Sequence, residues 1–190
     1  MDRPSRADAE AAVRTLLAYI GDDPDREGLL DTPKRFVKAY DDWFEGYRID
    51  PESVLSTTFE EVEGYDDLVL LKGIKVESHC EHHVAPILGH AHVAYLPRGR
   101  VVGLSKIARL VDAYGKRLQS QETLNERIAR TIEKVLEPRG VAVVIDATHQ
   151  CISTRGIHKD EVSCTTRTFL GEFETNQRLV DRFFRLVGRA

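Results

Sequence analysis

The sequence predicts an α+β fold in which strand pairing is mainly antiparallel. The first 60 residues have apolar residues at helical spacing and no β-type run, whereas short β-type runs begin near residue 68. Helices and strands are grouped and do not alternate strictly, as they would in a doubly wound parallel sheet. A chain of 190 residues has room for one substantial hydrophobic core. We therefore expect an N-terminal helical segment over residues 1–60 and a main domain over residues 61–190, together forming one functional unit.

Two helices are expected in the N-terminal segment. The first, over residues 6–20, is predicted from apolar residues at the spacing of one helix face, with Gly21 as its expected end. These apolar residues are Val13, Leu16, Leu17 and Ile20. The second helix is expected to begin at Thr32 and Pro33, with Thr32 as the cap and Pro33 at the first helical position.

The main domain is expected to contain four strands and three helices. The predicted strands cover residues 68–76, 90–96, 141–147 and about 163–173. The predicted helices cover residues 105–117, 121–136 and a C-terminal segment around 179–184. Ser105 is the expected cap of the first of these helices. A turn over residues 97–100 is expected to form a hairpin that leads into a further β run over residues 101–104.

Composition places the chain among ordinary globular proteins. Hydrophobic residues make up 42% and charged residues 31% of the sequence. The formal net charge of −4 argues against a general nucleic-acid-binding protein, although a local basic pocket could still bind one phosphorylated small molecule. The chain begins without an apolar leader, and its apolar runs are too short to span a bilayer. Three cysteines make no disulfide framework, so we expect a soluble cytoplasmic protein with no nucleic-acid or membrane partner.

The most informative feature is Cys-Glu-His-His over residues 80–83, taken together with His-Gln-Cys over residues 149–151. Two thiols and one imidazole, from Cys80, His83 and Cys151, can hold a zinc ion and leave a fourth position for water. This is the arrangement of hydrolytic zinc centres, whereas structural zinc sites normally have four protein ligands. The motif therefore favours zinc-assisted hydrolysis.

His82 and His149 flank the proposed ligands and are candidates for proton transfer. Alternate residues of an extended chain lie on the same side, so His149 and Cys151 are expected to reach the same pocket. Histidine titrates near pH ~6.5, which suits transfer in both directions. Cys164 has no second ligand nearby in the sequence, and we interpret it as a packing residue.

Two alternatives to a hydrolytic site remain open. A closed structural zinc site could recruit a fourth ligand from the other histidines. These histidines are His79, His90, His92 and His158. Alternatively, Cys80 and Cys151 could form a disulfide when metal is absent.

Two further clusters suggest a nucleotide ligand. Gln121 and Glu122 precede an amphipathic stretch; this is typical of an ordinary helix start, but amide and carboxylate groups can also match a guanine edge. The second cluster is basic, and it comprises Lys106, Arg109, Arg155, Arg35 and Lys38. Cations on helix faces usually serve solubility, but Lys106 and Arg109 at a helix start oppose the helix dipole and could instead bind phosphate.

Taken together, these motifs resemble the GTP cyclohydrolase I family, in matching order from about residue 20 onward. The matching stretches cover residues 27–35, 78–83, 89–97, 102–107, 117–122, 138–143 and 149–156. The sequence departs from many relatives at Cys164–Thr168 and at Ile157–Asp160, which leaves the proposed ligands unchanged.

The resemblance implies a role for each candidate residue. Zinc would be bound by Cys80, His83 and Cys151, and protons would be moved by His82 and His149. The remaining residues would bind GTP, through the guanine edge (Gln121, Glu122), near the phosphate and ribose (Ser105), or through the triphosphate (Lys106, Arg109, Arg155, Arg35, Lys38).

The implied reaction opens the imidazole ring of GTP, releases C8 as formate and yields 7,8-dihydroneopterin triphosphate. The implied fold is the tunnelling fold, an antiparallel sheet with helices packed on one face. The implied assembly is a homodecamer of two rings with active sites shared between subunits.

Overall fold

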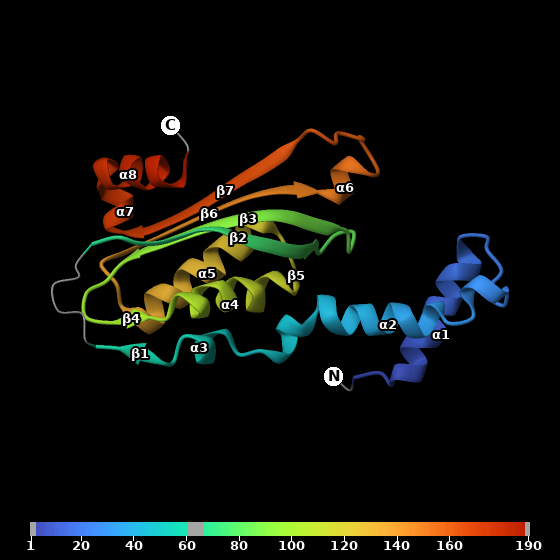
Figure 1. Ribbon diagram of the computed structural model, residues 1–190. Helices are drawn as coiled ribbons and strands as arrows, with labels where there is room; N and C mark the ends of the chain where they lie inside the picture. The colour runs from blue at the N-terminus through green and yellow to red at the C-terminus, as the bar shows by residue number, and fades with distance from the viewer. Residues whose placement is uncertain (1–2, 61–66, 189–190) are drawn as a thin grey trace. The chain divides into compact units, whose positions relative to one another are not determined.

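The computed structural model describes residues 3–60 and 67–188. The chain divides into two compact units, Met1–Glu45 and Gly46–Ala190, and each is described by itself (Figure 1). The predicted division into residues 1–60 and 61–190 concerns function and stays a prediction. Its boundary lies beside residues 61–66, which are outside the described part of the chain.

The first unit is built from two helices and a short 3-10 helix between them. These are α1 (Arg6–Tyr19), η1 (Glu27–Leu29) and α2 (Thr32–Trp43). Both longer helices lie where the sequence predicted them. Ser5 caps α1 in a capping box with Asp8. Asp31 holds the N-cap position of α2, so Thr32 begins this helix and the cap role predicted for it is wrong.

The second unit combines helices with a five-stranded sheet, which confirms the predicted α+β class. The elements from Glu45 onward are η2 (Glu45–Arg48), α3 (Pro51–Val54), β1 (Thr58–Phe59), β2 (Val69–Cys80), β3 (Pro86–Leu96), β4 (Val101–Val102), α4 (Leu104–Gly115), β5 (Leu118–Gln119), α5 (Gln121–Leu136), β6 (Gly140–His149), α6 (Gln150–Ser153), β7 (Ser163–Gly171), α7 (Glu172–Thr175) and α8 (Gln177–Val187). The sheet order is β5-β2-β3-β6-β7, and only the short β5–β2 pair is parallel. No described helix combines the length and the apolar character that a bilayer-spanning segment needs.

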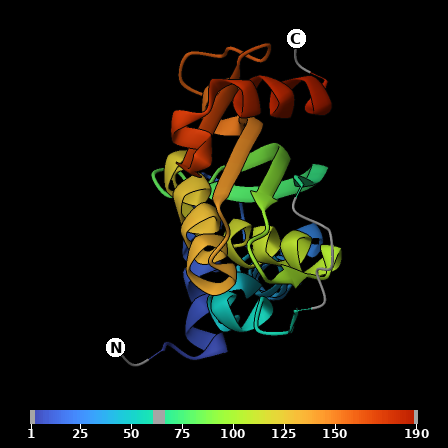
Figure 2. The ribbon, with the colours of Figure 1, turned by 90° about the vertical axis from the view of Figure 1, so that its left-hand side faces the viewer.

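Helices cover both faces of this sheet (Figures 1 and 2). The larger core lies between the sheet and the helices α4 and α5, and β3 contributes Val93 and Tyr95 to it. The alternate residues Ala94 and Leu96 belong to a second core with α7 and α8 on the opposite face. The α7–α8 layer is therefore additional to the one-face packing that the family resemblance implied.

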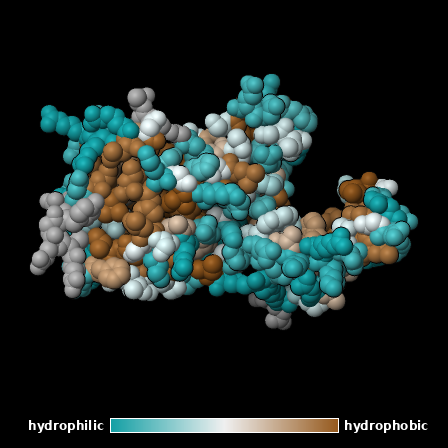
Figure 3. Space-filling model, viewed as in Figure 1, coloured by the Kyte–Doolittle hydropathy of each residue, from teal (hydrophilic) through white to brown (hydrophobic). Residues whose placement is uncertain are grey.

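One edge of the sheet is largely uncovered. Among the described residues, the outer edge of β2 is paired with β5 only at His79 and Cys80. Figure 3 shows an apolar patch on this side of the second unit, between α8 and α4. An unpaired strand edge beside apolar surface is typical of a region that associates with another chain.

The hairpin predicted over residues 97–104 is not formed. The short strand β4 pairs with β1, with Val102 opposite Thr58, and not with the preceding β3. The Val102 N–H donates to the Tyr95 hydroxyl at 3.3 Å, which holds β4 against the end of the sheet. Gly103 occupies the N-cap of α4, so the cap role predicted for Ser105 is also wrong.

Candidate metal site

A tight turn between β2 and β3 presents Cys80 and His83 together. The Cys80 N–H donates to the Ala85 carbonyl at 2.8 Å, and the Cys80 carbonyl accepts from the Val84 N–H at 2.8 Å. Val84 has a φ of 53°, a conformation that is strained for a β-branched residue. The result is a separation of 3.9 Å between Cys80 Sγ and His83 Nδ1. The turn thus brings the two potential ligand atoms of the Cys-x-x-His motif next to each other.

The third donor, Cys151, comes from the end of β6. The register of β3 and β6 extends to the pair Ile87 and His149, so β6 ends beside the β2–β3 turn. The expectation that His149 and Cys151 share one extended strand is wrong, because the chain turns into α6 directly after His149. This helix nevertheless completes a group with Cys80 and His83 in which all donor atoms lie within 4.8 Å of one another.

The three donors fit a zinc ion. Zinc–ligand bonds of about 2.0–2.3 Å in a tetrahedron separate the ligand atoms by about 3.5–3.8 Å, close to the 3.9 Å between Cys80 Sγ and His83 Nδ1. Burial, followed by the neighbouring Cys80 thiol, raises the pKa of Cys151, and a cation between the thiols would oppose that effect. Within residues 3–60 and 67–188 no other group of three possible ligands is present, and this group has no fourth member. The described residues therefore do not support the closed structural site.

His82 and His149 lie close to this group in different surroundings. His82 is largely exposed, with Nδ1 3.6 Å from Cys80 Sγ and Nε2 4.0 Å from a Glu81 carboxylate oxygen. His149 is half-buried. Its burial lowers its pKa, and the negative charge of Glu122 partly opposes this shift. A neutral imidazole beside a carboxylate can accept and release a proton near neutral pH.

Gln121 and Glu122, the first residues of α5, differ in exposure. Glu122 is exposed, whereas Gln121 is 1% exposed. The Gln121 amide donates to the carbonyls of Ile145 and Cys164, and its oxygen lies 2.8 Å from His149 Nε2. These internal partners hold the amide in the protein without ligand, and the guanine contact predicted for Gln121 stays a prediction. Glu122 stays the candidate for that contact.

The charge of Arg155 lowers the pKa of Cys151 against the larger effect of burial. This effect indicates that Arg155 lies near the metal-site residues. It follows α6 and is exposed. Two other predicted triphosphate ligands, Arg35 and Lys38, are exposed residues of α2 in the first unit. Their role in binding phosphate stays a prediction.

The remaining phosphate candidates lie in the first half of α4 (Leu104–Gly115). Ser105, Lys106 and Arg109 follow Leu104, the first residue of α4. The preceding strand β4 contacts Tyr95, and Tyr95 is paired with Val69 at the start of β2. Cys80 lies at the other end of β2, whose 12 residues span roughly 35 Å at about 3.3 Å per residue. The helix α4 then runs back along β2, so that Gly115 lies beside Glu77, and the role of these three side chains in binding phosphate stays a prediction.

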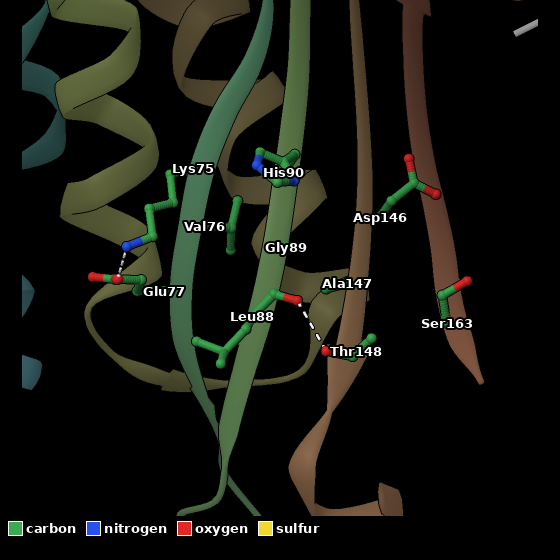
Figure 4. A pocket seen from close by; sticks show the side chains of 10 residues that line it. All are labelled: Lys75, Val76, Glu77, Leu88, Gly89, His90, Asp146, Ala147, Thr148 and Ser163. Atoms are coloured by element: carbon green, nitrogen blue, oxygen red, sulfur yellow. Dashed lines mark hydrogen bonds and ion pairs between the residues drawn. The ribbon is translucent and has the colours of Figure 1, made fainter. Parts of the chain in front are cut away.

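A hollow of about 520 Å³ lies on the open face of the sheet, outside the metal site (Figure 4). Three of the polar side chains that line it have partners within the hollow. Lys75 forms an ion pair with Glu77, and the Thr148 hydroxyl donates to the Leu88 carbonyl at 3.3 Å. These contacts are typical of a hydrogen-bonded sheet surface and do not indicate a second chemical centre.

Two polar residues of the network around Gln121, one buried and one partly buried, were not identified from the sequence. Asn125 and Thr166 are linked by a hydrogen bond from the Thr166 hydroxyl to Asn125 Oδ1 at 2.7 Å. Both also belong to the network around Gln121, since Gln121 Nε2 lies 3.0 Å from Thr166 Oγ1. The available signal was a second amide four residues after Gln121, on the face of the helix where apolar residues such as Ile128 are expected.

The fold and the site define an α+β protein with a candidate three-ligand metal site beside two histidines, the arrangement of metal-dependent hydrolases. A family model described as GTP cyclohydrolase I matches residues 9–188. The chain belongs to the GTP cyclohydrolase I family of enzymes, and the resemblance predicted from its motifs is confirmed.

Curated relatives match over nearly the whole chain. GTP cyclohydrolase 1 of Maricaulis maris (strain MCS10) is 61% identical over 188 residues, which cover 99% of this chain and 92% of the relative. GTP cyclohydrolase 1 of Brucella abortus (strain S19) is 58% identical over 185 residues, or 97% of this chain and 87% of the relative. Among solved structures, the archaeosine synthase QueF-Like in the apo form aligns with a TM-score of 0.45 and 24% identity, over 55% of this chain and 93% of that chain.

Proposed function

We propose that the protein hydrolyses the imidazole ring of GTP, releases C8 as formate and rearranges the product to 7,8-dihydroneopterin triphosphate. This reaction is the first step of folate and pterin biosynthesis. The observation that carries the proposal is the grouping of Cys80, His83 and Cys151 in a chain whose relatives are named GTP cyclohydrolase 1.

The proposed cofactor is zinc, held by Cys80, His83 and Cys151. When bound, zinc supplies a Lewis acid and lowers the pKa of a coordinated water toward about 7. Both thiols must lose their protons to serve as ligands, and a bound cation would oppose the effect of burial, which raises the pKa of Cys151. All three cysteines are free, which fits the reducing cytoplasm predicted from composition.

His149 and His82 are the proposed proton-transfer residues. His149 would donate a proton to a nitrogen of the purine imidazole ring, which makes C8 more electrophilic. Burial keeps His149 mainly neutral near pH 7, and the Glu122 carboxylate stabilises its charged form. His82, exposed beside Cys80, can exchange protons with solvent during the later steps.

Glu122 is the proposed guanine ligand. Its exposed carboxylate can accept paired hydrogen bonds from the amino group and ring N–H of guanine. The charge of Glu122 raises the pKa of His149 against the larger effect of burial, and this nearness of the two side chains supports a guanine position beside the proton-transfer residue. Arg155, near Cys151, would attract the triphosphate from the same side.

The complete site is proposed to form between subunits of a homo-oligomer, a decamer of two pentameric rings. Ser105, Lys106 and Arg109 would bind the triphosphate at the metal site of a neighbouring chain, together with Arg35 and Lys38. The support is that α4 begins near the end of β2 that lies opposite Cys80. The uncovered β2 edge and the adjacent apolar patch offer surface for assembly.

The test is incubation of metal-free and zinc-loaded protein with GTP. The zinc-loaded protein is expected to release formate and to form a pterin that fluoresces after oxidation and dephosphorylation. Zinc-loaded protein that forms neither product would overturn the proposal. X-ray absorption of the bound zinc separates the alternatives, because a hydrolytic site has an oxygen ligand and a closed structural site has only sulfur and nitrogen.

A further inference from the structure

The orientation of the Gln121 amide is determined by its neighbours. Gln121 Nε2 lies 3.0 Å from the carbonyl oxygens of both Ile145 and Cys164. Carbonyl oxygens only accept hydrogen bonds, so the end of the amide that faces them must be the NH₂ group. The opposite end, which faces His149, must therefore be the carbonyl oxygen Oε1.

The neighbouring hydroxyl agrees with this orientation. Thr166 Oγ1 donates to Asn125 Oδ1 at 2.7 Å and so can accept from Gln121 Nε2 at 3.0 Å. The Asn125 amide is oriented in the same way, since its Nδ2 donates to the carbonyls of Val143 and Thr166 at 3.0 and 3.2 Å. Two buried amides on one face of α5 thus bridge β6 and β7, and only Gln121 also reaches His149.

The oxygen of Gln121 selects one form of the histidine ring. Gln121 Oε1 is an acceptor and lies 2.8 Å from His149 Nε2, so Nε2 must carry a hydrogen to make this bond. A neutral His149 is then the Nε2–H tautomer, and Nδ1 is the nitrogen with the free lone pair. A hydrogen bond at one ring nitrogen also fixes the direction of the ring.

We propose that Gln121 is a positioning residue that holds His149 in the Nε2–H tautomer and leaves Nδ1 as the nitrogen that takes up the proton that His149 later donates. This role is separate from the guanine contact predicted for Gln121, which stays a prediction. The proposal rests on the proposed function for its consequence in turnover, whereas the tautomer itself is a property of the resting protein. A buried amide with partners on two strands is rigid, as a positioning group must be.

Kinetics with a matched pair of variants test the role in turnover. Gln121→Met removes the amide and keeps the length of the side chain, and Thr131→Val removes another buried polar group of α5, whose hydroxyl bonds to Tyr114 and not to His149. For Gln121→Met we expect kcat to fall by about 10- to 100-fold, with little change in the KM for GTP and full zinc content. For Thr131→Val we expect a loss of thermal stability, with kcat near that of the unmodified protein. Equal losses of kcat in both variants, or a rise in KM alone for Gln121→Met, would overturn the proposal.

The tautomer is measured without turnover. Solid-state ¹⁵N NMR of zinc-loaded, [¹⁵N]histidine-labelled protein, at a pH where the ring is neutral, distinguishes protonated from unprotonated ring nitrogens. The His149 signals are assigned by their loss in His149→Asn. The Nε2–H form is expected in the unmodified protein, and the Nδ1–H form would overturn the proposal even if Gln121→Met fails to fold. If the unmodified protein releases no formate but shows the Nε2–H form, the proposed function fails and the positioning geometry stands.

Discussion

The thiols of Cys80 and Cys151 lie close enough for Cys80 to raise the pKa of Cys151, although one residue ends β2 and the other lies in α6. The pair exists because β3 stands between β2 and β6 and is in register with both. The site therefore depends on sheet pairing as well as on the local Cys-x-x-His turn.

The substitution Cys151→Ala is expected to abolish zinc binding and formate release together. Only Cys80 and His83 would remain, and two ligands hold zinc far more weakly than three. Zinc content per chain and formate release are the measurements. Cys164→Ala is the matched control, since Cys164 is a thiol of β7 outside the group of three donors, and it should keep both properties. Zinc retained in Cys151→Ala would remove Cys151 from the ligand set.

The substitution His149→Ala is expected to keep zinc and to lower turnover by about 10²- to 10⁴-fold, the usual contribution of general acid–base catalysis. The reason is that His149 bonds to Gln121 and is not a member of the donor group. Formate release and zinc content are measured on the same preparation. His90→Ala, at an exposed position of β3, should leave both unchanged. Loss of zinc in His149→Ala would instead make His149 a metal ligand.

The elements with strong local signals were predicted well from the sequence. The helix predicted over residues 121–136 has the bounds of α5, because Ser120 caps it and its apolar residues follow one face. The pairing of β4 with β1 could not be predicted, since the two strands are distant in the chain and each contributes only two residues.

The candidate site was predicted in part. The donor residues could be found because a Cys-x-x-His turn and a second cysteine have recognisable chemistry, although the helix that holds Cys151 was taken for a strand. The position of Gln121 could not be found, because polar residues at a helix start normally face solvent and its burial depends on two strands that follow it in the chain. The distance of Lys106 from the metal site is likewise set by the path of the chain across the sheet, which local patterns do not show.

The substitution Gly89→Ala is expected to destabilise the protein by about 1–3 kcal/mol or more. A Cβ at Gly89 would lie 1.9 Å from the Asp146 carbonyl oxygen, and this backbone atom can move only if β3 and β6 separate. Urea denaturation followed by circular dichroism is the measurement. Gly99→Ala is the control, because a Cβ there meets no atom within 4 Å. Equal stability of the two variants would contradict the close approach of the strands.

The pair Asp67 and Arg182 is expected to stabilise the fold in a pH-dependent way. Hydrogen bonding to Arg182 is the largest cause that lowers the pKa of Asp67 from 3.8 to about 2. A lowered pKa stabilises the folded state above the ordinary pKa, and this contribution is lost as the pH falls from about 4 to about 2. Both side chains are about half exposed, so Asp67→Asn should cost less than about 1 kcal/mol at pH 7.

Urea midpoints of the unmodified protein and Asp67→Asn, measured at pH 7 and near pH 2, test this dependence. The difference between the two proteins should be present at pH 7 and vanish near pH 2. Asp160→Asn, in the exposed loop after α6, is the control and should show no difference at either pH. A difference for Asp67→Asn that persists at pH 2 would mean that the ion pair is not its source.

Shared active sites predict complementation between two inactive variants. Cys151→Ala lacks the metal site but keeps Arg109, whereas Arg109→Ala lacks a phosphate ligand but keeps the metal site. If Arg109 serves the metal site of a neighbouring chain, a site made of an intact metal group from one variant and an intact α4 from the other is complete. Random assembly in equal amounts makes such sites about a quarter of the total in a closed ring of equivalent interfaces.

The two proteins are denatured, mixed, refolded with zinc and assayed for formate, with each variant refolded alone as the control. Activity of roughly a quarter of that of the unmodified protein is expected, and a mixture no more active than its components would place Arg109 and the metal in the same chain's site or remove Arg109 from it.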